Sequence, residues 1–140
     1  MGLFTSNNNE IKDKVHEKFG ENFNAYLVAL KHNSAGKQIF NLVVSNLFSV
    51  WEDTRQYILC FTNKGIYEKD ISGSLNGDFI LIPWNEIKDF SVEETKNHVT
   101  IKIDHLGKIY AYKAEYNGKP FKGNEERKEG LKKIGWNREY

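Results

Sequence analysis

Between residues 56 and 114 the chain repeats one pattern: a short run rich in apolar and β-branched residues, then a few residues that favour turns. Connections this short suit antiparallel neighbours and leave no room for the crossover that parallel strands need. We therefore expect a meander of antiparallel strands in this part of the chain. The expected strands are 56–62, 65–71, 78–82, 88–93, 98–104 and 108–114.

The stretch ILCFTNKGIYEKD, residues 58–70, shows the pattern most clearly. Asn63, Lys64 and Gly65 separate two apolar runs, which is typical of a three-residue hairpin loop with glycine at a positive φ. A second tight turn is expected at 105–107. We interpret the 63–65 hairpin as scaffold rather than as a binding site, because the backbone freedom of glycine accounts for its composition.

The N-terminal part of the chain predicts one short helix. Ile11, Val15 and Phe19 recur every four residues and form a single apolar stripe, so we expect a helix over 10–20. Residues 1–9 are polar apart from the first few positions, and we expect them to be disordered.

A first strand is expected at 25–31, where apolar residues occupy both faces. A C-terminal helix is expected to start at Asn124, which would act as its N-cap, with acidic residues in its first turn and lysines in its last. The sequence therefore predicts a single mainly β (α+β) domain over 1–140, with its core at 25–135. Seven antiparallel strands would form a barrel or two orthogonal sheets closed by this helix.

Residues 37–51 predict a further helix, inserted between the first two strands. Ile39, Val43, Leu47 and Trp51 recur at intervals of four. Plotted at about 100° per residue, the apolar side chains fill about half of the circumference. A helix that lies on one sheet needs an apolar stripe of only about 100°. The excess breadth predicts a second cover for this helix.

Two origins of that cover remain open: the N-terminal helix of the same chain, or another chain. A helix on a membrane surface is less favoured, because the polar face carries Asn and Ser rather than Lys or Arg. Phe48 lies near the edge of the apolar arc, so light scattering of Phe48→Lys would test self-association. The predicted interaction surface consists of Phe40, Val44, Leu47, Phe48 and Trp51.

Charge and targeting signals limit the function classes. Lys+Arg total 20 and Asp+Glu 19, giving a net charge of +1, which argues against sequence-independent binding of nucleic acid. No secretory signal or apolar run long enough to span a bilayer is visible. A single cysteine gives no internal disulfide. We expect a cytoplasmic protein without a nucleic-acid partner.

The sequence predicts no catalytic, cofactor-binding or metal-binding residues, and hence no enzyme. Cys60 lies in an apolar strand and is expected to be a buried, inert thiol. Glu93 and Glu94 are adjacent in a strand and would point to opposite faces. The histidines at 16, 32, 98 and 105 lack the spacing of a metal site and are expected on the surface. The basic residues near the C-terminus are expected to form a solvated helix face with intrahelical ion pairs.

The segment 57–114 resembles bacterial proteins of the pleckstrin-homology-like (PH-like) class. The matching motifs are TNKG at 62–65 and IPWNEI at 82–87. The resemblance implies a PH-like fold and a non-catalytic interaction module that binds a protein partner or itself. Peripheral binding to an anionic membrane surface is the alternative. Because the inserted helix replaces the loop that carries phosphoinositide-binding Lys and Arg in eukaryotic relatives, selective phosphoinositide binding is not expected.

Overall fold

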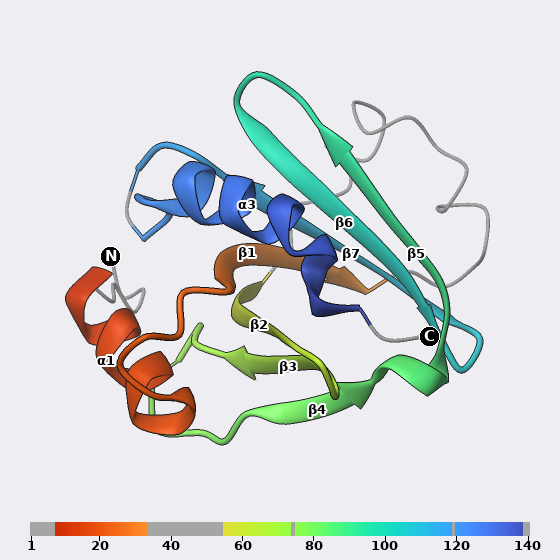
Figure 1. Ribbon diagram of the computed structural model, residues 1–140, viewed down its shortest axis with the longest axis horizontal. Coiled ribbons are helices and arrows are strands. Elements are labelled where there is room, and N and C mark those ends of the chain that lie inside the picture. The colour runs from red at the N-terminus through yellow and green to blue at the C-terminus, as the bar shows by residue number, and fades with distance from the viewer. Residues whose placement is uncertain (1–7, 34–54, 74, 119, 139–140) are drawn as a thin grey trace.

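The computed structural model describes residues 8–33, 55–73, 75–118 and 120–138 (Figure 1). Helix α1 and strand β1 are followed by six further strands, two short 3₁₀ turns (η3 and η4) and helix α3. The bounds are α1 Asn8–Phe19, β1 Tyr26–Asn33, β2 Arg55–Thr62, β3 Gly65–Asp70, β4 Ile80–Pro83, η3 Trp84–Glu86, β5 Ile87–Glu94, β6 His98–His105, β7 Lys108–Glu115, α3 Asn124–Lys133 and η4 Gly135–Asn137.

The seven strands form one antiparallel sheet in the order β4-β3-β2-β1-β7-β6-β5. This confirms the predicted mainly β class and the antiparallel pairing of the strands. The strands form two meanders, β1 to β4 and β5 to β7, which are joined by the pairing of β1 with β7. The sheet is not closed into a barrel: β4 and β5 are its edge strands, and no backbone pairing joins them among the described residues. Strand β4 ends at Pro83, which has no N–H to donate, and η3 follows at once. Figure 1 shows β5 and β6 crossing β3 and β4 at a steep angle, so the single sheet bends over its own core.

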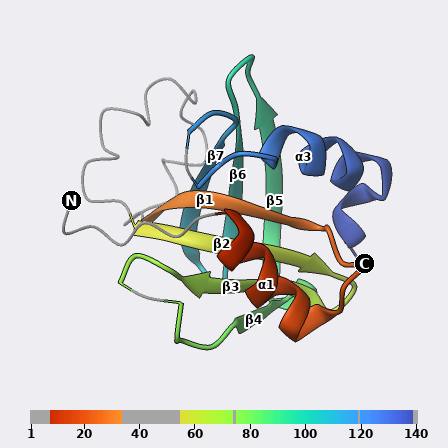
Figure 2. The ribbon, with the colours of Figure 1, turned by 90° about the vertical axis from the view of Figure 1, so that its left-hand side faces the viewer.

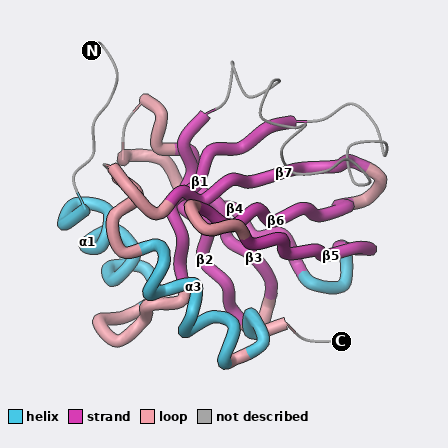
Figure 3. The backbone as a smooth tube through the Cα atoms, turned by 90° about the horizontal axis from the view of Figure 1, so that it is seen from above, coloured by secondary structure: helices cyan, strands magenta, loops and turns pink. Residues whose placement is uncertain are grey.

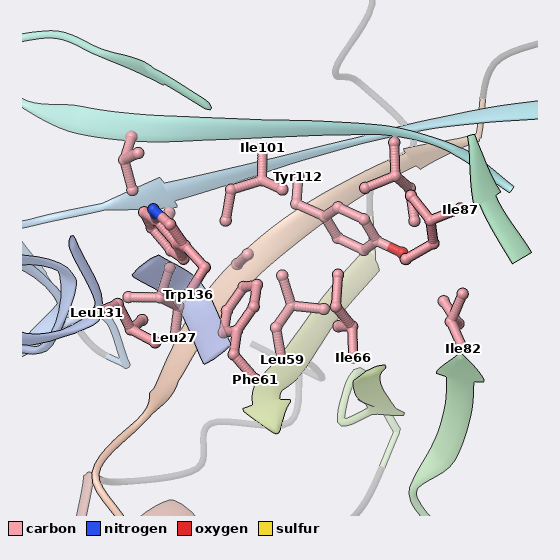
Figure 4. Close-up of a cluster of buried hydrophobic side chains, with 14 of the residues drawn as sticks. Leu27, Leu59, Phe61, Ile66, Ile82, Ile87, Ile101, Tyr112, Leu131 and Trp136 are labelled. Carbon is pink, nitrogen blue, oxygen red and sulfur yellow. The ribbon is translucent and has the colours of Figure 1, made fainter. Parts of the chain in front are cut away.

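The two faces of the sheet carry different apolar clusters, because successive strand residues point to opposite sides. On the inner face, strand residues such as Leu27, Leu59 and Phe61 pack with Leu131 of α3 and Trp136 of η4 (Figure 4). On the outer face, Ile11 and Val15 of α1 pack against a second cluster that includes Val28, Ile58 and Cys60. Figure 2 shows α1 in front of β2 and β3, as this packing requires. Burial of Ile11 and Val15 confirms the predicted apolar stripe of α1.

Strand β1 parts from β7 at its N-terminal end, and Asn124 fills the gap. The two strands pair only through residues 30–33 of β1. The Asn124 side chain accepts a bond from Val28 N (3.0 Å) and donates to Val28 O and Glu115 O (both 2.8 Å). The prediction that Asn124 caps α3 is therefore wrong: Gly123 stands before the helix at φ 95°, and Asn124 joins the helix to both strands.

Both predicted turns are present, each one residue shorter than expected. Asn63 and Lys64 alone separate β2 from β3, and Gly65 has the expected positive φ of 152°. A Cβ on Gly65 would lie 2.7 Å from Pro83 Cα, so glycine also permits the close approach of β3 and β4. In the second turn, Leu106 and Gly107 both have positive φ, as two-residue hairpin loops require.

Two expectations concern the N-terminal half. Helix α1 begins at Asn8, so residues 8 and 9, expected to be disordered, are helical. The predicted helix at 37–51 lies outside the described residues. Among the helices that the structure describes, none has the length and apolar character needed to cross a bilayer.

Candidate functional site

The structure does not place the predicted interaction surface. All five of its residues fall in 34–54, outside the described part of the chain. They are Phe40, Val44, Leu47, Phe48 and Trp51. Candidate sites are therefore sought among the described residues.

The residues considered for catalysis have mainly structural partners. Cys60 is fully buried, as predicted, and burial raises the pKa of its thiol well above the ordinary value. Glu93 bonds to Lys102 (2.7 Å), whereas Glu94 bonds to Lys128 (2.8 Å) on α3, which confirms that the two carboxylates diverge. His98 corrects the expectation of surface histidines, because it is 8% exposed and burial lowers the pKa of its imidazole.

The basic C-terminal residues also differ from expectation. Lys128 is only 3% exposed, and its partners include Glu94 of β5. Lys132 bonds to the other oxygen of Glu94 (2.8 Å). These two bonds lower the pKa of the Glu94 carboxyl, with the Lys128 bond contributing most. The predicted solvated face of intrahelical pairs is therefore partly a junction between α3 and β5.

A buried ion pair lies on the inner face, at the end away from α3. Lys31 Nζ donates to both carboxylate oxygens of Glu68 (2.8 and 2.9 Å), and the Tyr112 hydroxyl donates to the same carboxylate (2.7 Å). The rings of Tyr57 and Tyr110 lie 4.8 and 4.2 Å from Lys31 Nζ. We call this group the ionic end of the inner face. Its lysine and glutamate side chains are 7% and 13% exposed, so solvent screens the pair only weakly.

At the ionic end, the chain's own Lys31 occupies the cage of tyrosine rings. Burial raises the pKa of the Tyr112 phenol well above its ordinary value, and the carboxylate of Glu68 raises it further. We therefore assign the cluster to structure. Sequence reasoning missed it, although Lys31 follows Leu27 and Ala29 at the alternate spacing of one strand face.

A groove of about 620 Å³ lies between the segment before β1 and helix α3. Seen from above, α1 and α3 lie on the same side of the strands (Figure 3), although they cover opposite faces of the sheet. The lining of the groove is mixed. Apolar side chains come from Phe23, Ala25, Tyr26, Leu131 and Ile134, amides from Asn22, Asn24 and Asn137, and charges from Lys12, Glu126 and Arg127, with Gly123 and Gly130 completing the wall.

Arg127 lines the groove and is held in place by contacts with Tyr26 and Asn124. Its guanidinium lies 4.1 Å from the centre of the Tyr26 ring, Nε donates to Tyr26 O (2.9 Å), and a terminal nitrogen donates to Asn124 Oδ1 (3.0 Å). These bonds tie α3 to β1, so the groove is formed by two elements held in one arrangement. Such preformed concave surfaces are typical of binding sites.

Two residues of the groove, Gly130 in α3 and Ile134 directly after it, leave space for a ligand. Ile134 is 52% exposed, although it is a large apolar side chain. Gly130 stands in the helix interior, where glycine costs about 1 kcal/mol relative to alanine, and a Cβ there would meet no atom within 4 Å. Packing within the described chain therefore does not explain this glycine.

A metal site finds no support in the described residues, where no group of three or more His, Cys, Asp or Glu could hold an ion.

Comparison with known proteins does not identify a family: no family model, no curated protein and no solved structure matches this chain.

Proposed function

We propose that this chain is a non-catalytic interaction module that binds a segment of a partner protein in the groove between residues 22–26 and α3. The observation that carries the proposal is the preformed groove with the exposed Ile134 on its wall. Apolar anchors beside amide groups suit a peptide, whose side chains need apolar contact and whose backbone needs hydrogen-bond partners.

The strand order supports the finer proposal of a PH-like fold. The sheet runs β4-β3-β2-β1-β7-β6-β5, its strands form two meanders joined between β1 and β7, and a C-terminal helix packs on its inner face. This architecture agrees with the resemblance carried by the motifs at 62–65 and 82–87. Fold alone does not assign a function, so the groove has to carry that part of the proposal.

The test uses the tagged full-length chain as bait in the native lysate, with quantification of each captured protein. Ile134→Gln removes the apolar anchor, and Leu106→Gln is the matched control because Leu106 is 71% exposed and does not line the groove. We expect a specific partner to be captured by the wild type and the control and lost with Ile134→Gln. A partner captured equally by both variants would contradict the groove as its site.

Gly130 offers a test that does not rely on removing a contact. Gly130→Gln adds a side chain at a position with free space, and Gly130→Ala is its control. Both variants should gain helix stability, about 1 kcal/mol for alanine, so loss of binding by the larger side chain alone would indicate a blocked groove.

The alternatives predict different results. Self-association would appear in light scattering of the wild-type chain without any partner. Binding to an anionic membrane would appear in vesicle sedimentation and would fall with salt, because surface charge is screened. Either result with no effect of Ile134→Gln would favour that alternative over the groove.

A further inference from the structure

A second pocket lies away from the groove, where the β2–β3 turn, η3 and the start of β5 meet the residue after η4. Its volume is about 600 Å³. Three cations line it, and no acidic residue does. The lining residues are Asn63, Lys64, Pro83, Trp84, Asn85, Ile87, Lys88 and Arg138.

The pocket is held together by bonds between the turn and η3. Trp84 N donates to Lys64 O (3.2 Å), and the indole Nε1 of Trp84 donates to Thr62 O (2.7 Å). The Thr62 hydroxyl accepts bonds from the backbone of Lys64 (3.2 Å) and Gly65 (3.3 Å). The hairpin tip is thus fixed against the pocket floor rather than free in solvent.

Each cation is placed by an irregular piece of backbone. Lys64 stands at the hairpin tip, and Lys88 stands where the register between β5 and β6 shifts. Arg138 follows Trp136 and Asn137, two non-glycine residues with φ of 62° and 55°. Bulges re-aim side chains, and left-handed non-glycine residues are rare outside constrained sites.

The two lysines of the pocket, Lys64 and Lys88, are not neutralised by ion pairs with described residues. Glu86, the acidic residue of η3, bonds instead to His105 Nε2 (2.9 Å). The Arg138 guanidinium lies over the Phe90 ring at 5.2 Å, which orients it.

We propose that this cationic pocket binds an acidic peptide segment of a partner protein, separately from the groove of the proposed function. Carboxylates would pair with Lys64 and Lys88, and an adjacent apolar side chain would lie on Pro83 and Trp84. Asn63 and Asn85 supply amides for the peptide backbone. A small inorganic anion would contact only the cations of the pocket. An acidic peptide would match the positive charge and would also contact the amide and apolar residues of the lining, so the lining as a whole favours the peptide.

The test is a titration of the ¹⁵N-labelled full-length chain at low salt, followed by NMR. The probe is the peptide acetyl-Glu-Glu-Leu-Glu-amide, and its control is the same peptide with glutamine in place of glutamate. We expect saturable shifts at Asn63, Lys64 and the indole N–H of Trp84, and about tenfold weaker binding of the glutamine peptide. Shifts that do not saturate, or equal binding of the two peptides, would overturn the proposal.

Charge-reversed variants locate the interaction. Lys64→Glu/Lys88→Glu should weaken binding about tenfold or more, because each reversal turns an attraction into a repulsion. The control Lys96→Glu/Lys122→Glu changes the net charge equally at two exposed lysines outside the pocket and should change binding by about twofold at most. An equal loss in the two variants would overturn the pocket as the site. The amide spectrum shows whether each variant is folded.

Two further probes separate the source of the negative charge. Inorganic phosphate and vesicles containing anionic lipid are titrated under the same conditions. If either shifts the same residues at equal or lower concentration of anionic groups than the peptide, the pocket is a simple anion or membrane site and the proposal fails. If neither does, the peptide assignment stands. Ile134→Gln should leave this binding unchanged, so failure here is distinguishable from failure of the groove.

Discussion

The inner face of the sheet is stabilised in different ways at its two ends. At the end covered by α3, which we call the apolar end, Phe61 packs edge to face with Trp136 at a centroid distance of 5.1 Å, and Leu131 is 1% exposed. At the ionic end, Lys31 and Glu68 form a buried pair among tyrosine rings. Strands β1 and β2 contribute to both ends.

The difference teaches how each end should respond to change. Apolar packing loses stability in proportion to the contacts removed, so its losses are graded. A buried ion pair behaves asymmetrically: removing one partner leaves the other charge buried and unpaired, whereas replacing both with apolar residues is often nearly neutral. Mutations can therefore test whether the two ends really differ in kind.

The largest loss is expected at the apolar end from a change of backbone rather than of side chain. Gly65→Val would force a Cβ into the carbonyl of Ile82 and the Cα of Pro83, in addition to its positive φ. We expect a loss of about 4 kcal/mol or more in the free energy of unfolding, which is larger than the loss caused by most single substitutions. Urea unfolding monitored by tryptophan fluorescence measures it.

Gly107→Val is the matched control, because Gly107 has a φ of 92° but no atom within 4 Å of the added Cβ. It should cost only the backbone strain, about 1–3 kcal/mol. Similar losses at the two glycines would show that the close approach of β3 to β4 adds nothing to strain.

The second prediction concerns the removal of one partner from the ion pair of the ionic end. Glu68→Ala leaves the Lys31 ammonium without its carboxylate and removes the acceptor of the Tyr112 hydroxyl. We expect a loss of about 3 kcal/mol in unfolding free energy, the low end of the range for breaking a buried pair, because the Glu68 side chain is 13% exposed. Thermal and urea unfolding at neutral pH measure the loss.

The double variant Lys31→Met/Glu68→Leu sharpens the same comparison. It removes both charges and fills their place with apolar side chains, but it leaves the buried Tyr112 hydroxyl without its acceptor. We therefore expect a loss of about 1–2 kcal/mol, clearly smaller than that of Glu68→Ala. If the double variant were as unstable as Glu68→Ala, the unpaired charge of Lys31 would not be the cause of the loss. The ionic end would then lose stability with the contacts removed, as the apolar end does.

The strands and turns could be predicted from sequence because their signals are local. Alternation of Val99, Ile101 and Ile103 defines an inner face within one strand, and Gly65 marks a turn without reference to the rest of the chain. The unclosed sheet could not be predicted in this way, because closure depends on whether β4 meets β5 across the whole molecule.

The ionic end and the role of Asn124 depend on partners far along the chain. Lys31 and Glu68 lie 37 residues apart, and only the register of β1, β2 and β3 brings them together. Asn124 carries a local cap signal, but the gap between β1 and β7 uses its amide instead. Of the candidate sites, the predicted surface at 37–51 lies outside the described residues, and the groove needs Ile134 and residues 22–26 to meet in space.

The smallest expected effect comes from Tyr112→Phe, which removes one hydroxyl from the ionic end and keeps the ion pair. The change should cost about 1 kcal/mol at neutral pH, the net value of one hydrogen bond. Its pH dependence is more informative, because burial and the Glu68 carboxylate raise the pKa of the Tyr112 phenol.

The sign of that dependence follows from proton linkage. Below pH 10 the phenol is protonated in the folded and unfolded chains, so its contribution is fully present. Above pH 10 the unfolded chain loses the proton while the folded chain keeps it, and stability falls as pH rises toward the raised pKa. Phenylalanine cannot ionise, so the stability of Tyr112→Phe should fall less steeply above pH 10, by up to about 1.4 kcal/mol per pH unit. Urea unfolding at several pH values between 9 and 11 measures both slopes, and equal slopes would mean that Tyr112 ionises as freely in the folded chain as in the unfolded one.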